Sequence, residues 1–257
     1  GLNDPFMIRY LNYIIHALQG DFGSSYRTGL PVFHEIFVRF PVTLKLAISS
    51  IVVVVILGIS LGILSAVKQY SLLDFITTVC AMLVASIPGF WLGLMLILLF
   101  SLHLGWLPSS GIDSWKGYIM PTLTLALPST AEVIRMTRST MLETIRQDYI
   151  RTARSKGAKE MEVMWKHALR NALLPVVTVI GSNFGSLLGG TVLIETVFAL
   201  PGLGSLVVTS IRSKDIPQVM GATLFIAFLF CIVLLIVDIA YAYIDPRVRT
   251  RYEMGNK

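Results

Sequence analysis

Long uncharged apolar runs constrain this chain more than any other feature of its sequence. A helix needs about 20 predominantly apolar residues to cross a hydrocarbon core of about 30 Å, and residues 46–67 supply such a run without one charged side chain. Four further apolar runs cover residues 75–102, 119–136, 172–194 and 218–237. Only 14% of the chain is charged, against about 25% in a typical soluble domain. The sequence therefore predicts an all-α integral membrane protein with about five spans.

Two of these runs are irregular. The run 75–102 is longer than a span needs and carries Pro88-Gly89 in its middle. This pair predicts a kink, or a break around a pathway, since proline removes a helix hydrogen bond and irregular backbone lines cavities in membranes. Whether Pro88 and Gly89 form a structural bend or a gate stays open. The run 119–136 is the weakest span, because prolines interrupt it and Glu132 and Arg135 enter its inner end.

Charge gives the orientation. The net charge of +6 comes from Lys and Arg gathered near span ends, where the positive-inside rule explains them better than nucleic-acid binding does. We expect residues 1–41 to form an external segment with short helices, and residues 42–257 to form the transmembrane domain. Residues 138–172 would be a cytoplasmic module, and residues 195–217 an external loop. An external N-terminal segment without a signal predicts one more span upstream, so six in the parent protein. The C-terminus would be cytoplasmic, with Arg247, Arg249, Arg251 and Lys257 in the tail.

The basic module 138–172 contains two amphipathic helical patterns that meet at Gly157, a residue suited to the positive φ of a helix C-terminus. Its basic side chains would cost roughly 2.5–3.5 kcal/mol each at a bilayer centre, so the module lies outside the lipid. Its apolar positions then need a protein to cover them, although a basic loop can also be a simple orientation signal. The first stripe is Leu142, Ile145, Tyr149 and Ala153; the second is Met161, Met164, Trp165, Ala168 and Ala172.

The same module carries a resemblance to a known family. Permeases of binding-protein-dependent ABC importers have a cytoplasmic motif of Glu-Ala-Ala, three residues, Gly, nine residues, Ile-x-Leu-Pro. Arg151-Thr152-Ala153 occupies the first place here, Gly157 follows at the right interval, and Leu174-Pro175 is displaced. The chain is similar to the dipeptide, oligopeptide and nickel branch in DYIRTARSKGA, ALQGDFGSSYRTGLPV, RFPVTLKLA, ETVFALPGLG and DPRVR.

That resemblance implies a type I ABC importer permease in a bacterial inner membrane. Its partners would be two ABC ATPase subunits, a second, related but distinct permease subunit, and an extracytoplasmic substrate-binding protein. The chain has no GxxxxGK[ST] phosphate loop, so ATP and Mg would be bound by the partner ATPase, and no cofactor is expected here. The passenger would be a di- or oligopeptide, with nickel or a metal–chelator complex as the alternative. The residues expected to couple to the ATPase are Arg151, Thr152, Ala153, Arg154, Lys156, Gly157, Ala158, Met161, Met164 and Trp165.

Candidates for the pathway or a gate are Pro88, Gly89, Asn183, Ser186 and Glu195. Each has a structural alternative: Asn183 and Ser186 could hydrogen-bond between helices, and Glu195 could cap a helix or pair with a loop. Glycines at positions 181, 185 and 189 form a small-residue face that predicts close helix packing. An ion-driven transporter would need ionisable groups at mid-span, whereas the acidic groups of this chain gather near the span ends. An intramembrane enzyme would need a Ser/His/Asp set, an HExxH motif or paired carboxylates within the spans, and the sequence shows none of these. The four histidines show no ligand spacing, and no metal site is expected.

Overall fold

A computed structural model describes residues 4–244, apart from the surroundings of Leu188, Gly190 and residues 240–244. All regular elements in that part of the chain are helices, as expected. They are α1 (Phe6–Leu18), α2 (Val32–Val67), α3 (Leu72–Ser86), α4 (Gly89–Leu96) with a π-helical extension (Ile97–His103), a 3₁₀ turn (Trp115–Tyr118), α5 (Ile119–Ile145), α6 (Asp148–Ser155), α7 (Glu160–Glu162) with a π-helical extension (Val163–Ala168), α8 (Leu169–Val197), α9 (Leu203–Arg212) and α10 (Ile216–Ile244). The basic tail and the DPRVR segment lie outside the described residues.

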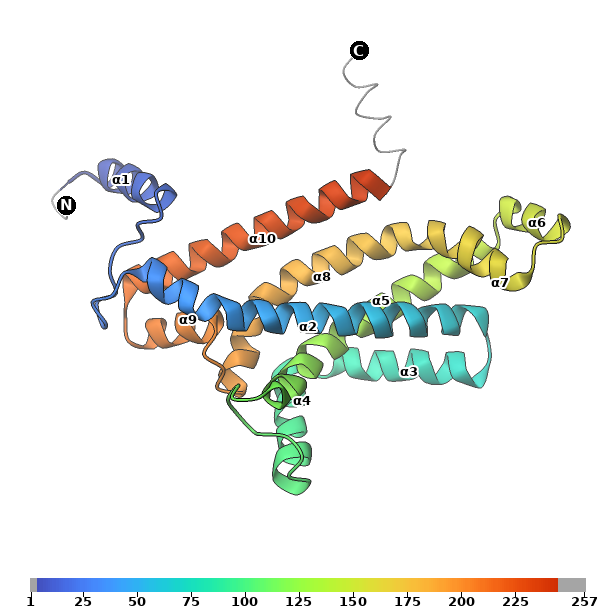
Figure 1. Cartoon of the computed structure of the whole chain (residues 1–257), viewed down its shortest axis with the longest axis horizontal. Helices are drawn as coiled ribbons and strands as arrows, with labels where there is room; N and C mark the ends of the chain where they lie inside the picture. The colour runs from blue at the N-terminus through green and yellow to red at the C-terminus, as the bar shows by residue number, and fades with distance from the viewer. Residues whose placement is uncertain (1–3, 245–257) are drawn as a thin grey trace, which may run out of the picture.

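The long helices α2, α5, α8 and α10 run along one bundle, with α3 beside α2 (Figure 1). The short helices α6 and α7 project from one end of this bundle, and α1 and α9 lie at the other end. The described end of α10 points toward the end that carries α6 and α7. The described end of α10 and the basic module therefore lie toward the same end of the bundle.

Helix α2 begins at Val32 rather than at residue 46, where the uncharged run starts. Pro31, whose ψ of 130° is extended, precedes its first turn. The first part of the helix carries Glu35, Arg39 and Lys45. Because of these charges, the uncharged run alone does not show where the helix begins. A short helix near the N-terminus was also expected, and α1 confirms it.

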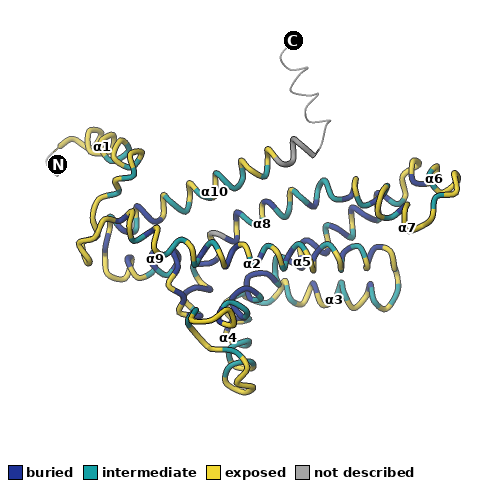
Figure 2. Tube along the Cα trace, in the orientation of Figure 1, coloured by how far each residue is buried: buried dark blue, intermediate teal, exposed yellow. Residues whose placement is uncertain are grey.

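The run 75–102 is broken at Pro88-Gly89, as its sequence predicts. Helix α3 ends at Ser86, and the axis of Gly89–His103 is turned by 103° from that of Leu72–Ser86. The second half therefore points away from the bundle (Figure 1). Much of its surface is exposed and apolar (Figure 2), including Phe90, Trp91, Leu98 and Leu102.

Helix α5 occupies the centre, in contact with α2, α3, α4 and α8. Two glycines of α2 allow its close approach: a Cβ on Gly58 would lie 2.6 Å from Val133 Cγ1, and one on Gly62 would lie 2.5 Å from Thr137 Cβ. Val54, Ala126, Val133 and Val176 form one buried cluster between α2, α5 and α8. The position of α5 is thus fixed by side-chain packing on several faces.

The predicted small-residue face of α8 packs against α10. A Cβ on Gly181 would lie 2.2 Å from Val237 Cγ1, and one on Gly185 would lie 2.8 Å from Phe230 Cε2. Close packing is therefore confirmed at these two positions. A Cβ on Gly189 would meet nothing within 4 Å, so that glycine does not belong to the contact.

Within the described part of the chain, two helices are long and apolar enough to cross a membrane alone, namely Val32–Val67 and the segment Ile216–Ile239 of α10. Two bent pairs qualify if each is counted as one span: Leu72–Ser86 with Gly89–His103, and Glu160–Leu187 with Thr191–Val197. Helix α5 is long enough to span the membrane with its 27 residues, but its polar side chains make it less apolar than these helices.

Candidate coupling elbow and translocation path

The two helical patterns of the basic module meet at Gly157, as predicted. We call residues 148–168 the elbow. Gly157 has a φ of +84°, its N–H donates to the Arg154 carbonyl at 2.9 Å, and the Ala158 N–H donates to the Ala153 carbonyl at 3.2 Å. These bonds form a Schellman motif, which closes α6 and satisfies its last carbonyl groups. The turn therefore depends on a glycine for its conformation.

The elbow is attached to the bundle through one buried cluster. Ile150 and Val163 of the elbow are fully buried together with Met141 of α5, Ala66 of α2 and Ala172 of α8. The half-buried Ala153 and Ala158, one on each side of Gly157, pack against the same cluster. In addition, Asn171 Nδ2 donates to Tyr149 Oη at 3.0 Å. A displacement of the elbow would therefore be transmitted to α2, α5 and α8 together.

The apolar stripe of the second pattern is divided. Met161 is 71% exposed and Trp165 is 58% exposed, whereas Met164 is half-buried against the cluster around Ile150. The π-helical turn Val163–Ala168 shifts the helical phase and buries Val163 and Ala168. Two large apolar side chains thus face outward from the end of the molecule, where α6 and α7 are mostly exposed (Figure 2).

The charged groups of the elbow are exposed and partly paired within it. Arg154 donates from Nη2 and Nε to the Glu160 carboxylate at 2.7 and 3.1 Å, and Arg151 lies 3.8 Å from Asp148. The Arg154 hydrogen bond holds the pKa of Glu160 below its ordinary value. Thr152 and Lys156 are exposed. The Arg154 pair bridges α6 and α7 and so supports the turn at Gly157.

A buried ion pair joins three helices near the elbow. The Arg138 guanidinium of α5 donates from Nε and Nη2 to the two Asp74 oxygens of α3 at 2.7 and 2.9 Å. Ser65 of α2 and the Tyr70 N–H donate to the same carboxylate at 2.5 and 3.0 Å. Asp74 is 5% exposed, so its charge needs these donors.

The pathway candidates are spread along the bundle. Pro88 and Gly89 form the break between α3 and α4. Ser186 is exposed on α8, while Asn183 is half-buried and its Nδ2 atom has no partner among the described residues. Glu195 is fully buried. The structure therefore does not bring these five residues together at one site.

Glu195 is held by the loop that follows α8. Thr43 Oγ1 of α2 donates to its Oε1 at 2.6 Å, and the Ser205 N–H donates to its Oε2 at 3.0 Å. A Cβ on Gly202 would lie 2.3 Å from the carboxylate, so the loop needs glycine to wrap around it. Glu195 thus joins α2, α8 and α9 through the loop around Gly202, in agreement with the prediction that it pairs with a loop.

We expect Thr43→Val to destabilise this junction by about 1–3 kcal/mol, because a buried group that loses its hydrogen-bond partner carries a cost of that order. The change removes the donor to Glu195 and also the acceptor of the Leu203 N–H, which lies 2.8 Å from Thr43 Oγ1. Thermal unfolding of the purified chain in detergent measures the effect. Thr43→Ser keeps the hydroxyl group and should stay close to the wild type; equal losses in both variants would contradict the assignment.

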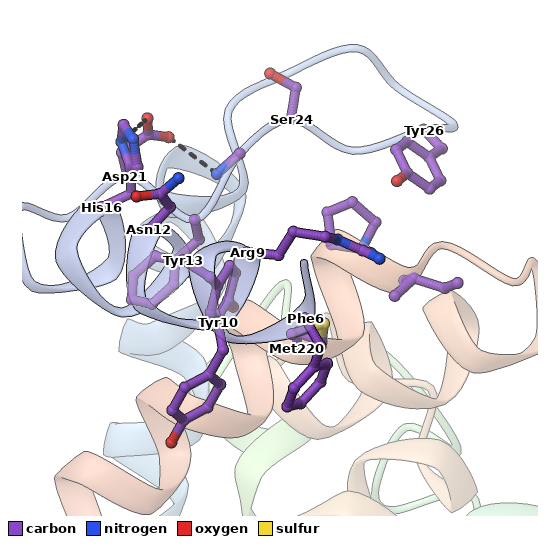
Figure 3. Close-up of a pocket in the computed structure, with 14 residues that line it drawn as sticks. Phe6, Arg9, Tyr10, Asn12, Tyr13, His16, Asp21, Ser24, Tyr26 and Met220 are labelled. Atoms are coloured by element: carbon purple, nitrogen blue, oxygen red, sulfur yellow. Dashed lines mark hydrogen bonds and ion pairs between the residues drawn. The ribbon is translucent and has the colours of Figure 1, made fainter. Parts of the chain in front are cut away.

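A second junction lies at the same end of the bundle, between α9 and α10. Ser25 Oγ and the Tyr26 N–H donate to Asp215 at 2.5 and 3.1 Å, which fastens the loop after α1 to the start of α10. Burial raises the pKa of Asp215, but these bonds outweigh it and hold the pKa below its ordinary value. Beside this junction, Arg9, Tyr10 and Tyr13 of α1 contribute to a pocket of about 680 Å³ (Figure 3).

Sequence reasoning missed several of these groups. Thr43, Asp74 and Arg138 pair with residues far away in the chain, which no local pattern shows. A signal did exist for the charged residues, since each stands in or next to an apolar run where an unpaired charge is costly. Between residues 4 and 244, the structure contains no group of three or more His, Cys, Asp or Glu side chains that could hold a metal ion.

Comparison with known proteins gives a consistent result. Residues 58–250 match the family described as binding-protein-dependent transport system inner membrane component. The glutathione transport system permease protein GsiC of Escherichia coli K12 is 44% identical over 249 residues, which cover 97% of this chain and 81% of that protein. GsiC of Salmonella choleraesuis is 43% identical over the same shares.

Solved structures agree on the fold. A chain of the MetNI methionine ABC transporter, in an inward-facing conformation, matches 82% of this chain and 96% of its own length with a TM-score of 0.70 at 18% identity. A chain of an amino acid ABC transporter matches 83% of this chain and 94% of its own length with a TM-score of 0.62 at 16% identity. The relatives are permeases, so this chain is a transport subunit and not an ATPase. It belongs to the family of inner-membrane permease components of binding-protein-dependent ABC importers.

Proposed function

We propose that this chain carries small peptides of the glutathione type across the inner membrane, together with a second permease subunit. The likeness in sequence to glutathione permeases supports a peptide passenger over nickel or a metal–chelator complex. A soluble binding protein would deliver the peptide to the end that carries α1 and α9, and two separate ATPase subunits would act at the elbow. The elbow and the C-terminus would then be cytoplasmic.

The observation that carries this proposal is the form of the elbow. It projects from one end of the bundle, exposes Met161 and Trp165, and is joined through Ile150 to α2, α5 and α8. Large apolar side chains on a projecting, charged element are typical anchors for a protein partner. A rigid-body motion of the ATPase would therefore reach the spans through one packed cluster.

Replacing Gly157 tests the elbow. Gly157→Val should lower ATP-dependent glutathione uptake by roughly 5- to 30-fold, because a side chain in the left-handed region costs about 1–2 kcal/mol. Open space surrounds the position, since a Cβ there would meet nothing within 4 Å, so the effect would come from the backbone alone. Uptake into proteoliposomes and co-purification of the ATPase measure it.

Gly157→Asn is the matched control, because asparagine tolerates positive φ. It should retain near-normal uptake. Normal assembly and normal uptake in the valine variant would remove the role assigned to the elbow. Efficient uptake of a nickel complex but not of glutathione by the wild type would contradict the proposed passenger and leave the coupling role intact.

A further inference from the structure

Helix α5 presents one polar stripe to the outside. Glu132, Arg135 and Ser139 are exposed on it at spacings of three and four residues, so they lie on one face. The other faces of α5 are buried against α2, α3 and α8. Glu132 is the fourteenth of the 27 residues between Ile119 and Ile145. Because α5 continues past the predicted span 119–136 into the basic module, Glu132 and Arg135 lie in the inner half of that span.

The neighbouring helix α8 continues this polar surface. Thr178, Ser182 and Ser186 are exposed at four-residue spacing, and Val179 of α8 meets the stripe of α5. An open groove of about 320 Å³ runs between the two helices. It is lined by Glu132, Arg135, Met136, Ser139 and Val179. We call this groove and the exposed hydroxyl groups of α8 the polar face.

The exposed surfaces of the neighbouring helices have a different character. On α3 they include Phe75, Ile76, Met82 and Leu83, and on α10 Leu224, Phe228, Leu235 and Ile236. Such surfaces suit lipid. Glu132 lies within the predicted span 119–136, and a charged side chain that faces lipid inside a span costs up to about 2.5–3.5 kcal/mol, so we expect the polar face to border water or protein.

The charged groups of Glu132 and Arg135 in the groove are available to bind a ligand. Within the described residues, neither Glu132 nor Arg135 has an ion-pair or hydrogen-bond partner. Side chains three residues apart on a helix are neighbours, with Cβ atoms about 5–6 Å apart. The groove therefore offers one negative and one positive group side by side, which suits a solute that carries an ammonium and a carboxylate group.

We propose that the polar face lines the translocation path, and that Glu132 and Arg135 bind the ammonium and carboxylate groups of a zwitterionic peptide in transit. This inference rests on the proposed function and names the residues that would contact the passenger. Because the groove is open and both side chains are exposed, binding there would be weak, as a site that must release its solute requires.

Uptake of radiolabelled glutathione by the complete reconstituted importer tests the two charges. Glu132→Gln and Arg135→Gln should each lower the uptake rate at sub-saturating glutathione about tenfold, with normal yield of the assembled complex. Glu143→Gln is the matched control, because Glu143 is exposed on the same helix but outside the groove; it should stay within about twofold of the wild type. Wild-type uptake in both groove variants would overturn the proposal. So would loss of the second permease subunit from either variant, since the charges would then be a subunit contact.

A labelling experiment tests the water-lined path independently of the passenger. In a Cys80→Ala/Cys231→Ala background, Ser182→Cys should react with a cationic, membrane-impermeant thiosulfonate in at least one nucleotide state, because Ser182 is exposed at the middle of α8 and outside the cytoplasmic module. Phe228→Cys, on the apolar surface of α10, should stay unlabelled. Absence of labelling at position 182 in every state would overturn the polar path even if the elbow variants behave as proposed.

Discussion

Arg138→Met is expected to destabilise the chain by about 3 kcal/mol, because it leaves the Asp74 carboxylate buried without its cation. The pair joins α3 to α5, and Ser65 of α2 donates to the same carboxylate. We place the effect at the lower end of the range for buried pairs, since the Arg138 side chain is 27% exposed while that of Asp74 is 7% exposed. Thermal unfolding in detergent, followed by helical circular dichroism, measures the loss.

The elbow offers a matched control for this prediction. Arg154 binds Glu160 with the same two-bond geometry, but the two side chains are 38% and 60% exposed. Exposed pairs contribute only about 0–1 kcal/mol, so Arg154→Met should change stability little. Similar losses in the two variants would show that burial does not distinguish the pairs.

Ile150→Asp is expected to separate the elbow from the spans. Ile150 is fully buried between Met141, Val163 and Ala172, and an unpaired carboxylate in such a cluster carries a cost of several kcal/mol. The spans have their own clusters, so the chain should still insert into the membrane. ATP-dependent uptake should fall more than about tenfold, measured in proteoliposomes beside the yield of inserted protein.

Ile150→Val is the control for that experiment. It keeps an apolar side chain and removes one methylene group, which costs about 0.5–1.5 kcal/mol. Uptake should stay near the wild-type rate. Equal uptake by the aspartate and valine variants would show that the motion of the ATPase is not transmitted to the helix bundle through the cluster around Ile150.

Local patterns predicted much of this structure. The uncharged runs located parts of α2, α3, α8 and α10, the Pro88-Gly89 pair located the break, and Gly157 located the turn of the elbow. Each of these features depends on residues adjacent in the chain. The 103° angle at the break could not be predicted, because it depends on packing against helices far away in the sequence.

The second stripe of the elbow divides into two faces. Met161 and Trp165 share an exposed face, where Trp165 Nε1 donates to Met161 Sδ at 3.1 Å. Met164 and Ala168 pack instead against the buried cluster that contains Val163. The charges of α5 marked it as the weakest span. The structure shows why the helix tolerates them, since packed neighbours cover its other faces and leave one side for Glu132 and Arg135.

The Schellman turn has a consequence for assembly of the importer. Its backbone groups are bonded to one another before any ATPase arrives, and Ile150 holds it in place. A loop that becomes ordered only on contact loses conformational entropy at that moment, which weakens the complex. In the proposed complex this elbow would lose little, so the contact energy of Met161 and Trp165 would be retained as affinity.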